Sequence, residues 1–416
     1  MSTVDAPWNG WGLTPRAAPA WQSAAALARL AVAGLPTTRE ESWRNTSLKV
    51  ALTAAYRAPT SGTLEAGVVD AVAALAVPTA DRVWVMVDGC IVPALGRGTP
   101  APLADASLAV GSLASAGDGY AALAEVFAAE VAALRVAAGS DAGVVQVICI
   151  TQASSPTVVH PRLWVQVGAG AKVTLLESHV VLGAVASLAN AVVEVDVEPD
   201  ATVTHGVIDE VARVGTTRVR QTFVALGRGG TYHRHVTSAG GGGIVRDVVD
   251  VRLAERSNVV VDTIQLVHAG DHIDHRLVLR HEGRDASSTH TTRGVVTAKG
   301  RAVVDSNVHV GREAGGASAR QSMKHLLVSP DGDARARPRL EIEVDEVTAS
   351  HGATVGQLDR DQLAYLRSRG VPEATARQML TEAFVAEVVD RAPAALRDPI
   401  RSKVEAVLPA RLGGAT

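Results

Sequence analysis

The sequence predicts a mainly β protein, with a central right-handed parallel β-helix (a solenoid) flanked by N-terminal and C-terminal helical segments. Between Val144 and Val347, short valine-rich strands alternate with turn residues, whereas both flanking stretches have helical spacing. Small residues that follow a turn signal recur in this region at Ala171, Ala201, Gly230, Asn258, Ala286, Ala302, Ala317 and Ala334. Their successive separations are 30, 29, 28 and 28 residues, then 16, 15 and 17.

A period near 28–30 residues that halves to about 16 indicates coils built from similar strand–turn units. An antiparallel sandwich is the alternative, but its strands usually repeat at about 8–12 residues. The spacing therefore favours the solenoid, with inward Val, Leu and Ile side chains filling its interior.

Three parts follow from these patterns. Residues 1–143 form an N-terminal helical and mixed domain, with a helix around Trp21, a break at Gly34–Pro36, a second helix anchored by Trp43, and a strand at Val83–Val87. Residues 144–349 form the β-helix core, and residues 350–416 form a C-terminal helical domain. Since the ends of a solenoid need covers, the two helical parts are expected to supply them.

The stretch from Pro338 to Gly370 carries the densest signals. Leu340, Ile342 and Val344 alternate with acidic residues, which predicts a strand with one packed face. The small residues Ser350–Gly356 then predict a tight loop. Asp359 is an N-cap candidate for a helix that ends at Gly370, and Pro372 opens a second helix.

Composition excludes several classes of function. A net charge of −3 gives no basic field for nucleic acid. Cys90 and Cys149 are far apart, which argues against a disulfide framework or a self-contained cysteine cluster site, and both are interpreted as small buried side chains. With neither a secretory signal nor a membrane span evident, a cytoplasmic location is expected.

Thirteen histidines raise the possibility of a metal site. His233 and His235 lie two apart on a predicted strand, and so they share a face. The densest group comprises His268, Asp271, His272, Asp274, His275 and His281. Because zinc needs three or four converging ligands, we interpret these residues as surface or coil-edge side chains, with Asp271 and Asp274 at a turn.

Three motifs in order, P-x-LEI at Pro338, SHGATVG at Ser350 and YLRSRG at Tyr365, resemble the SufB/SufD family of the SUF iron–sulfur cluster assembly system. Weaker matches are GLP with E-x-W-R-x-T over Gly34–Thr46, VDG at Val87–Gly89, and QSMKHLLVS at Gln321–Ser329. SufB proteins carry a glutamate-rich version of the histidine segment, so the resemblance favours the SufD branch.

The resemblance implies a non-catalytic scaffold that pairs with a SufB-like subunit and recruits the ATPase SufC through its C-terminal helices. This chain has no GxxxxGK[ST] motif, so the ATPase would be another protein. The implied partner-binding residues are Leu363, Tyr365, Leu366, Met379, Leu380 and Phe384. The same residues could form an ordinary helical core stripe.

His351 is the implied metal residue, placed near the nascent cluster and shared with the partner. No cofactor is expected on the chain alone, only a transient iron–sulfur cluster in the complex. Many SufD proteins have cysteine two residues earlier, where this chain has Ala349. A purely structural His351 is the alternative.

Two other functions stay open on the sequence. One is a homodimeric scaffold that pairs through exposed coil edges. The other is a carbohydrate-active β-helix enzyme, which would need aromatic platforms and carboxylate pairs. With only 3% aromatic residues, and Trp164, Phe223 and Tyr232 alone in the solenoid region, the enzyme is disfavoured.

Overall fold

A computed structural model describes residues 11, 26–59, 64–98, 110–114, 118–152, 155–183, 185–209 and 215–412. The helix predicted around Trp21 begins outside these residues. Among the helices in these ranges, none is long and apolar enough to cross a membrane.

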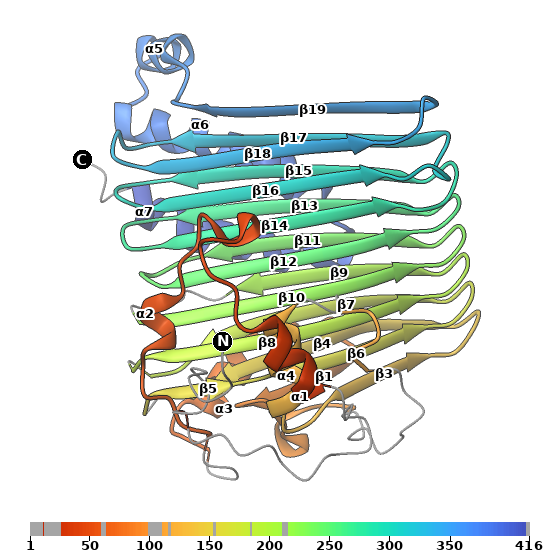
Figure 1. The fold of residues 1–416 in the computed structure, drawn as a ribbon. Helices are drawn as coiled ribbons and strands as arrows, with labels where there is room; N and C mark the ends of the chain where they lie inside the picture. The colour runs from red at the N-terminus through yellow and green to blue at the C-terminus, as the bar shows by residue number, and fades with distance from the viewer. Residues whose placement is uncertain are drawn as a thin grey trace.

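Two sheets form the body of the molecule (Figure 1). The ten-stranded sheet has the order β19 (Val347–Gly356), β17 (Ala317–Leu327), β15 (Ser287–Val296), β13 (Asn258–Val267), β11 (Thr231–Ala239), β9 (Thr202–Asp209), β7 (Lys172–Val181), β4 (Asp141–Thr151), β1 (Arg82–Val87) and β2 (Cys90–Ile91). The nine-stranded sheet has the order β18 (Asp333–Ile342), β16 (Arg301–Val310), β14 (His272–His281), β12 (Ile244–Leu253), β10 (Thr216–Leu226), β8 (Ser187–Val197), β6 (Arg162–Val167) and β3 (Ala132–Val136), with β5 (Thr157–Val159) beside β8.

The chain alternates between the two sheets, so one full coil contributes one strand to each. Equivalent positions of successive coils pair in parallel register, and one such column runs through Thr202, Thr231, Asn258, Ser287, Ser318 and Thr348. The longer period of the sequence is therefore a whole coil. The shorter one is half a coil, because Ala302 and Ala334 lie on the nine-stranded sheet and Ala317 on the other. The predicted parallel solenoid is confirmed.

Side chains that point between the sheets build one long apolar core along the solenoid. It includes Val173, Val203, Val259, Ala319 and Leu279, all buried. These residues occupy alternate positions of their strands, as the period-2 pattern requires. The core fills one lateral half of the interior, and the other half contains polar side chains described below.

Helices cover the outer faces of both sheets. The N-terminal elements are α1 (Ala26–Ala33), η3 (Glu41–Trp43), α2 (Lys49–Leu52), α3 (Val68–Leu75), η4 (Pro93–Leu95) and α4 (Gly119–Phe127). The C-terminal ones are α5 (Arg360–Ser368), α6 (Glu373–Arg391) and α7 (Ala394–Leu412). Residues of α6 and α7 such as Val388, Leu396 and Ile400 are buried against the outer face of the ten-stranded sheet.

The prediction that the C-terminal helices cover the end of the solenoid is wrong. The ten-stranded sheet has an apolar outer face, at Leu176, Ile264 and Leu266 among others, and α6 and α7 gain more burial there. In Figure 1, α5 projects beyond β19 without lying over it, and none of its side chains is buried. Among the described residues, no helix therefore covers the last coil.

Two local predictions also differ from the structure. The segment Ser350–Gly356, expected as a loop, lies in β19, which pairs with β17 from Ala317–Val347 to Leu326–Gly356. The edge of β17 supplies ladder partners that outweigh the low strand propensity of glycine. The second N-terminal helix is only the short turn Glu41–Trp43 followed by α2, because the Trp43 ring packs against the nine-stranded sheet.

Candidate functional site at the open end of the solenoid

The last coil, β18 and β19, has no coil above it. Within the described ranges, β19 pairs as a strand only with β17, and β18 only with β16. Their side chains are mostly exposed or half-buried, whereas those of the preceding coils are mostly buried. Leu340, Val347 and Ala349 still pack against the apolar core. Two free edges and an uncovered interior thus meet at one end of the molecule.

His351 lies in the middle of β19, and its side chain is exposed. It shares strand parity with Val347 and Ala349, which pack into the core, so it belongs to the inward face of the last coil. Directly beneath it in register is Gln321 of β17, which is only 4% exposed. The imidazole therefore stands at the mouth of the solenoid interior, where a partner that closed this end would meet it.

The predicted partner-binding residues fall into two environments. On α5, capped by Asp359, Leu363 and Leu366 are half-buried and Tyr365 is 59% exposed. On α6, Met379 is 46% exposed. None of these four side chains belongs to a buried apolar cluster of the described residues.

Leu380 and Phe384, also on α6, are half-buried. Phe384 packs against the apolar cluster beneath α6 and α7, and the Arg293 guanidinium lies 5.8 Å from its ring. At least part of Phe384 therefore belongs to the core, as the ordinary helical stripe predicts.

The histidine cluster of the sequence is divided by strand alternation. His272 and Asp274 face outward from β14, while His275 and His281 face inward. His268 and Asp271 lie at the preceding turn, where Asp271 accepts a hydrogen bond from the backbone of His268 at 2.7 Å. Throughout the described ranges, no three His, Cys, Asp or Glu side chains are grouped to hold a metal.

His233 and His235 do share the outer face of β11. His233 Nε2 lies 3.3 Å from Asp262 Oδ2. His235 is fully buried beneath the helices, and neither of its ring nitrogens has a hydrogen-bond partner in the described structure. Burial lowers the pKa of His235 to about 4, so the ring is neutral at physiological pH.

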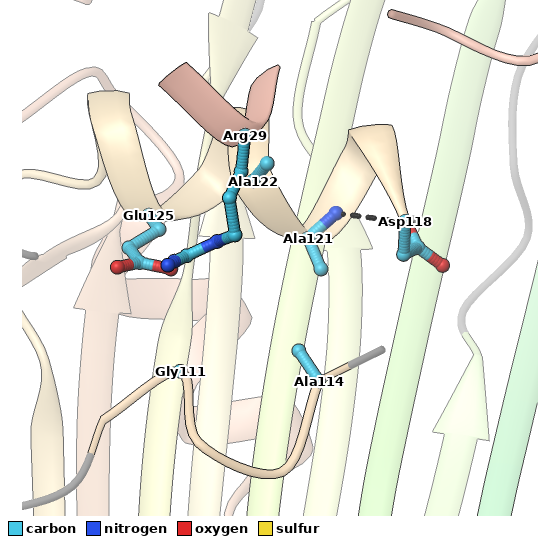
Figure 2. Close-up of a pocket in the computed structure, with 7 residues that line it drawn as sticks. All are labelled: Arg29, Gly111, Ala114, Asp118, Ala121, Ala122 and Glu125. Carbon is cyan, nitrogen blue, oxygen red and sulfur yellow. Dashed lines mark hydrogen bonds and ion pairs between the residues drawn. The ribbon is translucent and has the colours of Figure 1, made fainter. Parts of the chain in front are cut away.

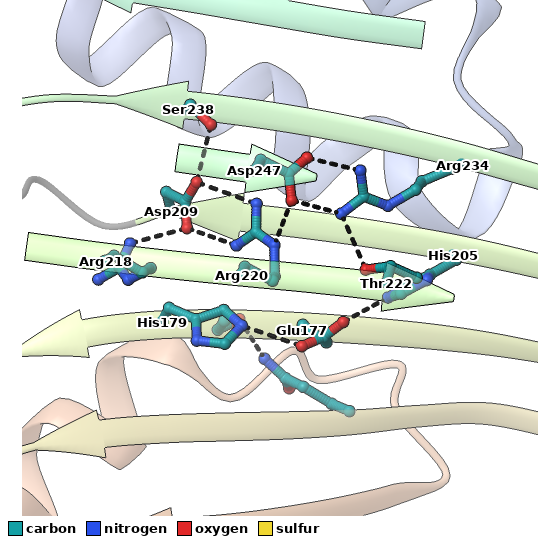
Figure 3. Close-up of polar contacts among 12 residues, drawn as sticks. Glu177, His179, His205, Asp209, Arg218, Arg220, Thr222, Arg234, Ser238 and Asp247 are labelled. Atoms are coloured by element: carbon teal, nitrogen blue, oxygen red, sulfur yellow. Dashed lines mark hydrogen bonds and ion pairs between the residues drawn. The ribbon is translucent and has the colours of Figure 1, made fainter. Parts of the chain in front are cut away.

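A buried charge network inside the solenoid was not predicted from the sequence (Figure 3). Asp209 accepts hydrogen bonds from Arg218 at 2.7 Å and Arg220 at 2.9 Å. Asp247 accepts from Arg220 at 2.8 Å and from Arg234 at 2.7 Å. All five side chains are at most 4% exposed, so the three positive charges depend on the two carboxylates and on the nearby Glu177.

The charges in this network hold one another ionised. Burial alone would raise the pKa of Asp247, but Arg220 and Arg234 lower it far below its usual range. Asp209 is likewise lowered well below its usual pKa by Arg220 and Arg218, against the effect of burial. The sequence signal was the parity of Arg218 and Arg220, which share the inward face with core residues of β10.

A second buried group adjoins the network. Burial would raise the pKa of Glu177, but hydrogen bonds from His179 at 2.9 Å and His205 at 2.6 Å outweigh it and hold that pKa well below its usual value. His205 Nδ1 also lies 2.7 Å from the Tyr232 hydroxyl. Cys149 pairs in register with His179, and burial raises the pKa of its thiol, so Cys149 is an unreactive interior side chain, whereas Cys90 is half-buried.

The N-terminal strap, which we define as Glu41–Thr46, crosses the outer face of the nine-stranded sheet. The Arg246 guanidinium lies 4.1 Å above the Trp43 ring and donates to the backbone oxygen of Ser42 at 2.6 Å. Thr46 is buried and donates its hydroxyl to Asp274. The E-x-W-R-x-T motif is thereby explained as an anchor on β12 and β14.

The strap also reaches the free edge of that sheet. Glu41 accepts hydrogen bonds from Arg337, at 3.0 Å, and from Arg339, both on β18. These ion pairs are partly exposed, and each contributes on the order of 1 kcal/mol or less. Their effect is to hold β18, the edge strand of the nine-stranded sheet, in place.

A small cavity of about 200 Å³ lies between α1 and α4 (Figure 2). Arg29 and Glu125 form an ion pair in it. Asp118 caps α4 by accepting from the backbone of Tyr120 and Ala121, each at 3.0 Å. The polar groups that line this cavity serve the packing of α1 and α4, so we assign no ligand to the cavity.

The comparisons with known proteins agree with this architecture. The family model described as "SUF system FeS cluster assembly, SufBD core domain" matches residues 149–384, more than half of the chain. The iron–sulfur cluster assembly protein SufD of Escherichia coli K12 is 33% identical over 176 residues, which are 42% of this chain and 41% of that protein. SufD of Bacillus subtilis 168 is 29% identical over 217 residues, 49% of this chain and 47% of its own length.

The chain thus aligns with about half, or less, of each of these relatives. The family model nevertheless covers most of the solenoid, from β4 to α6, and ends beyond the open coil that holds His351. The parallel solenoid, its open last coil and the matched core domain place the chain in the SufBD family of iron–sulfur cluster assembly proteins.

Proposed function

We propose that this chain is a non-catalytic scaffold subunit of the SUF system. Its open coil pairs with a SufB-like subunit, and the apolar surface of α5 and α6 binds a SufC-like ATPase. No cofactor is bound by the chain alone, and a transient iron–sulfur cluster forms at the subunit interface, next to His351. The observation that carries the proposal is the uncovered last coil.

Free strand edges and an open solenoid end are normally capped or blocked, because their backbone groups recruit other strands. In the part of the chain that the structure describes, no cap and no further strand lies over β19. A second β-helix placed against this end would satisfy the edge backbone groups and bury Val355 and Ile342, which are 43% and 40% exposed.

His351 supplies a nitrogen at this interface, and a neutral imidazole suits iron. Cys149 and Cys90 lie on β4 and β2, near the other end of the ten-stranded sheet, so they cannot add a thiolate beside Ala349. The remaining ligands would therefore come from the partner. Movement of two ATPase-bound ends on ATP binding would open or strain this interface and admit iron and sulfide.

The pairing is tested with Ala353→Lys. Ala353 is an exposed, inward residue of β19, so the lysine is solvated in the free chain but must be buried when a partner covers the end. An unpaired buried charge costs about 3–5 kcal/mol. We expect at least a 100-fold weaker affinity for the co-expressed SufB-like subunit in co-purification and light scattering.

Thr354→Lys is the matched control. Thr354 is an exposed residue of the same strand whose side chain points away from the solenoid interior, so a lysine there should leave pairing intact. Tyr365→Asp, on α5, should reduce capture of the ATPase alone. Equal pairing by Ala353→Lys and the native chain would refute the proposed interface. If Ala353→Lys lost self-association while it still bound the SufB-like subunit normally, the homodimeric scaffold would be favoured.

The role of His351 is tested by anaerobic reconstitution of the co-purified complex with iron and sulfide. His351→Ala should leave assembly intact and reduce the cluster signal in absorption and electron paramagnetic resonance spectra at least 10-fold, because one iron ligand is lost. His309→Ala, at a half-buried histidine on the outer face of β16, is the control. Full cluster formation by the His351 variant would make that histidine structural.

A further inference from the structure

We propose that Gln321 positions His351 by accepting a hydrogen bond from its imidazole on Oε1. The use of the positioned ring as an iron ligand rests on the function proposed above. The positioning itself is a property of the chain alone, and nothing in the sequence motifs assigned a role to this glutamine.

The amide of Gln321 is held in one orientation. Its Nε2 donates to Ser306 Oγ at 2.9 Å and to the backbone oxygen of Ser306 at 3.2 Å, and it lies 3.5 Å from the backbone oxygen of Arg339. Two carbonyl acceptors require the amide nitrogen on that side, so the oxygen faces elsewhere. Ser306 is itself held by His290, at 3.1 Å.

The other end of the amide lacks a partner. Gln321 Oε1 is buried, and no hydrogen bond reaches it from the described residues. Buried acceptors are normally satisfied, because leaving one bare forfeits its hydration without replacement. Gln321 Oε1 therefore needs a hydrogen-bond donor.

Only one side chain of the last coil is suited to donate this hydrogen bond. The inward residues of β19 and β18 are Val347, Ala349, His351, Ala353, Val355, Ala334, Ala336, Pro338, Leu340 and Ile342. Nine of these ten are apolar, and His351 is stacked on Gln321 in register. Since neighbouring strands lie about 4.8 Å apart, a rotation of the exposed ring brings a ring N–H within reach of Oε1.

Such a bond has a chemical consequence. A neutral imidazole has one N–H donor and one lone pair, and a hydrogen bond to one nitrogen determines which nitrogen keeps the lone pair. If the N–H is donated inward to Gln321, the free lone pair faces the open end. This is the arrangement in which a histidine is oriented to ligate a metal.

The test uses the isolated chain, labelled with ¹⁵N-histidine, with the His351 ring signals identified by their loss in His351→Ala. We expect one tautomer to account for at least nine-tenths of His351 in the native chain. Gln321→Met, which keeps the volume but removes the acceptor, should convert it to a mixture.

Gln265→Met is the matched control. Gln265 is a buried, inward glutamine of the same sheet, and it bonds His325 at 3.0 Å. Its loss should change the His325 signals and leave those of His351 unaltered. If Gln321→Met does not fold, Gln321→Asn withdraws the amide by one methylene and serves the same purpose.

A native His351 with the same tautomer mixture as Gln321→Met would overturn the proposal. The measurement needs neither partner nor iron, so its outcome is separate from that of the reconstitution. A fixed tautomer combined with normal cluster formation by His351→Ala would uphold the positioning and refute the ligand role. A mixture of tautomers in the native chain, combined with loss of the cluster in His351→Ala, would refute the positioning and uphold the ligand role.

Discussion

Lowering the pH from 7 towards 4 is expected to unfold the chain cooperatively. Burial lowers the pKa of His160 to about 3, and that of His235, His275, His290 and His325 to about 4. In the unfolded chain each would titrate near 6.5. At a pH between the folded-state and unfolded-state pKa values, these histidines are protonated in the unfolded chain but not in the folded chain. The free energy of unfolding therefore falls as the pH falls.

The expected effect is large because the histidines act together. Each contributes up to about 1.4 kcal/mol per pH unit in this window, and a whole domain is typically stable by only about 5–15 kcal/mol. The carboxylates Glu177, Asp209 and Asp247 have lowered pKa values, so the stability they add is lost only below about pH 4. Unfolding above pH 4 would therefore report on the histidines.

Circular dichroism and tryptophan fluorescence across this pH range give the midpoint. His325→Gln should lower it by a few tenths of a pH unit, since glutamine can still bond Gln265 but does not take up a proton. His309→Gln, at a ring on the outer face of β16 that is 32% exposed, should not lower it. A native midpoint below pH 4 would contradict the prediction.

The second large effect is expected from Asp247→Ala, which leaves Arg220 and Arg234 without a shared carboxylate inside the solenoid. Removing one partner of a buried ion pair typically costs about 3–5 kcal/mol, because the remaining charge stays desolvated and unpaired. Urea unfolding at pH 7.5 should show this loss as a lower midpoint with an unchanged slope.

Asp250→Ala on the same strand is the control. Asp250 is also paired with an arginine, Arg280, at 3.0 Å, but on the outer face, where Arg280 is 41% exposed. Solvent screens that pair, so about 0–1 kcal/mol is expected. Equal losses from the two variants would mean that the interior of the solenoid is well hydrated around Asp247.

Replacing both partners of the ion pair tests whether the loss of stability comes from the unpaired charge that Asp247→Ala leaves behind. Buried ion pairs exchanged for apolar residues of similar volume are often neutral or stabilising. Asp247→Leu combined with Arg234→Met should therefore recover much of the loss caused by Asp247→Ala. Failure to recover would indicate that Arg220 still needs the carboxylate.

Some of the structure could be predicted because it depends on local periodicity. The recurrence of Ala171, Ala201 and Gly230 reflects the length of one coil, which is set by strand and turn geometry. Asp359 accepts hydrogen bonds from the backbone of Asp361 and Gln362, as its position before a helix predicted. Gly370 has a φ of 84°, the left-handed conformation expected just past a helix end.

Other features were beyond the sequence because strand alternation identifies two faces but not which one is interior. In this solenoid both faces of many strands are buried, one between the sheets and one beneath helices. The sequence analysis therefore singled out none of Arg218, Arg220 and Arg234, which are at most 4% exposed. Only the pairing of distant strands brings Asp209 and Asp247 to them.

The sequence by itself determined the solenoid, its approximate repeat and the caps of α5, since each follows from contacts within a few residues or within one coil. The tertiary structure decided where the covers lie. The helices bury more apolar surface on the outer face of the ten-stranded sheet than over its end, so β19 is left open and His351 stands at its mouth, above Gln321.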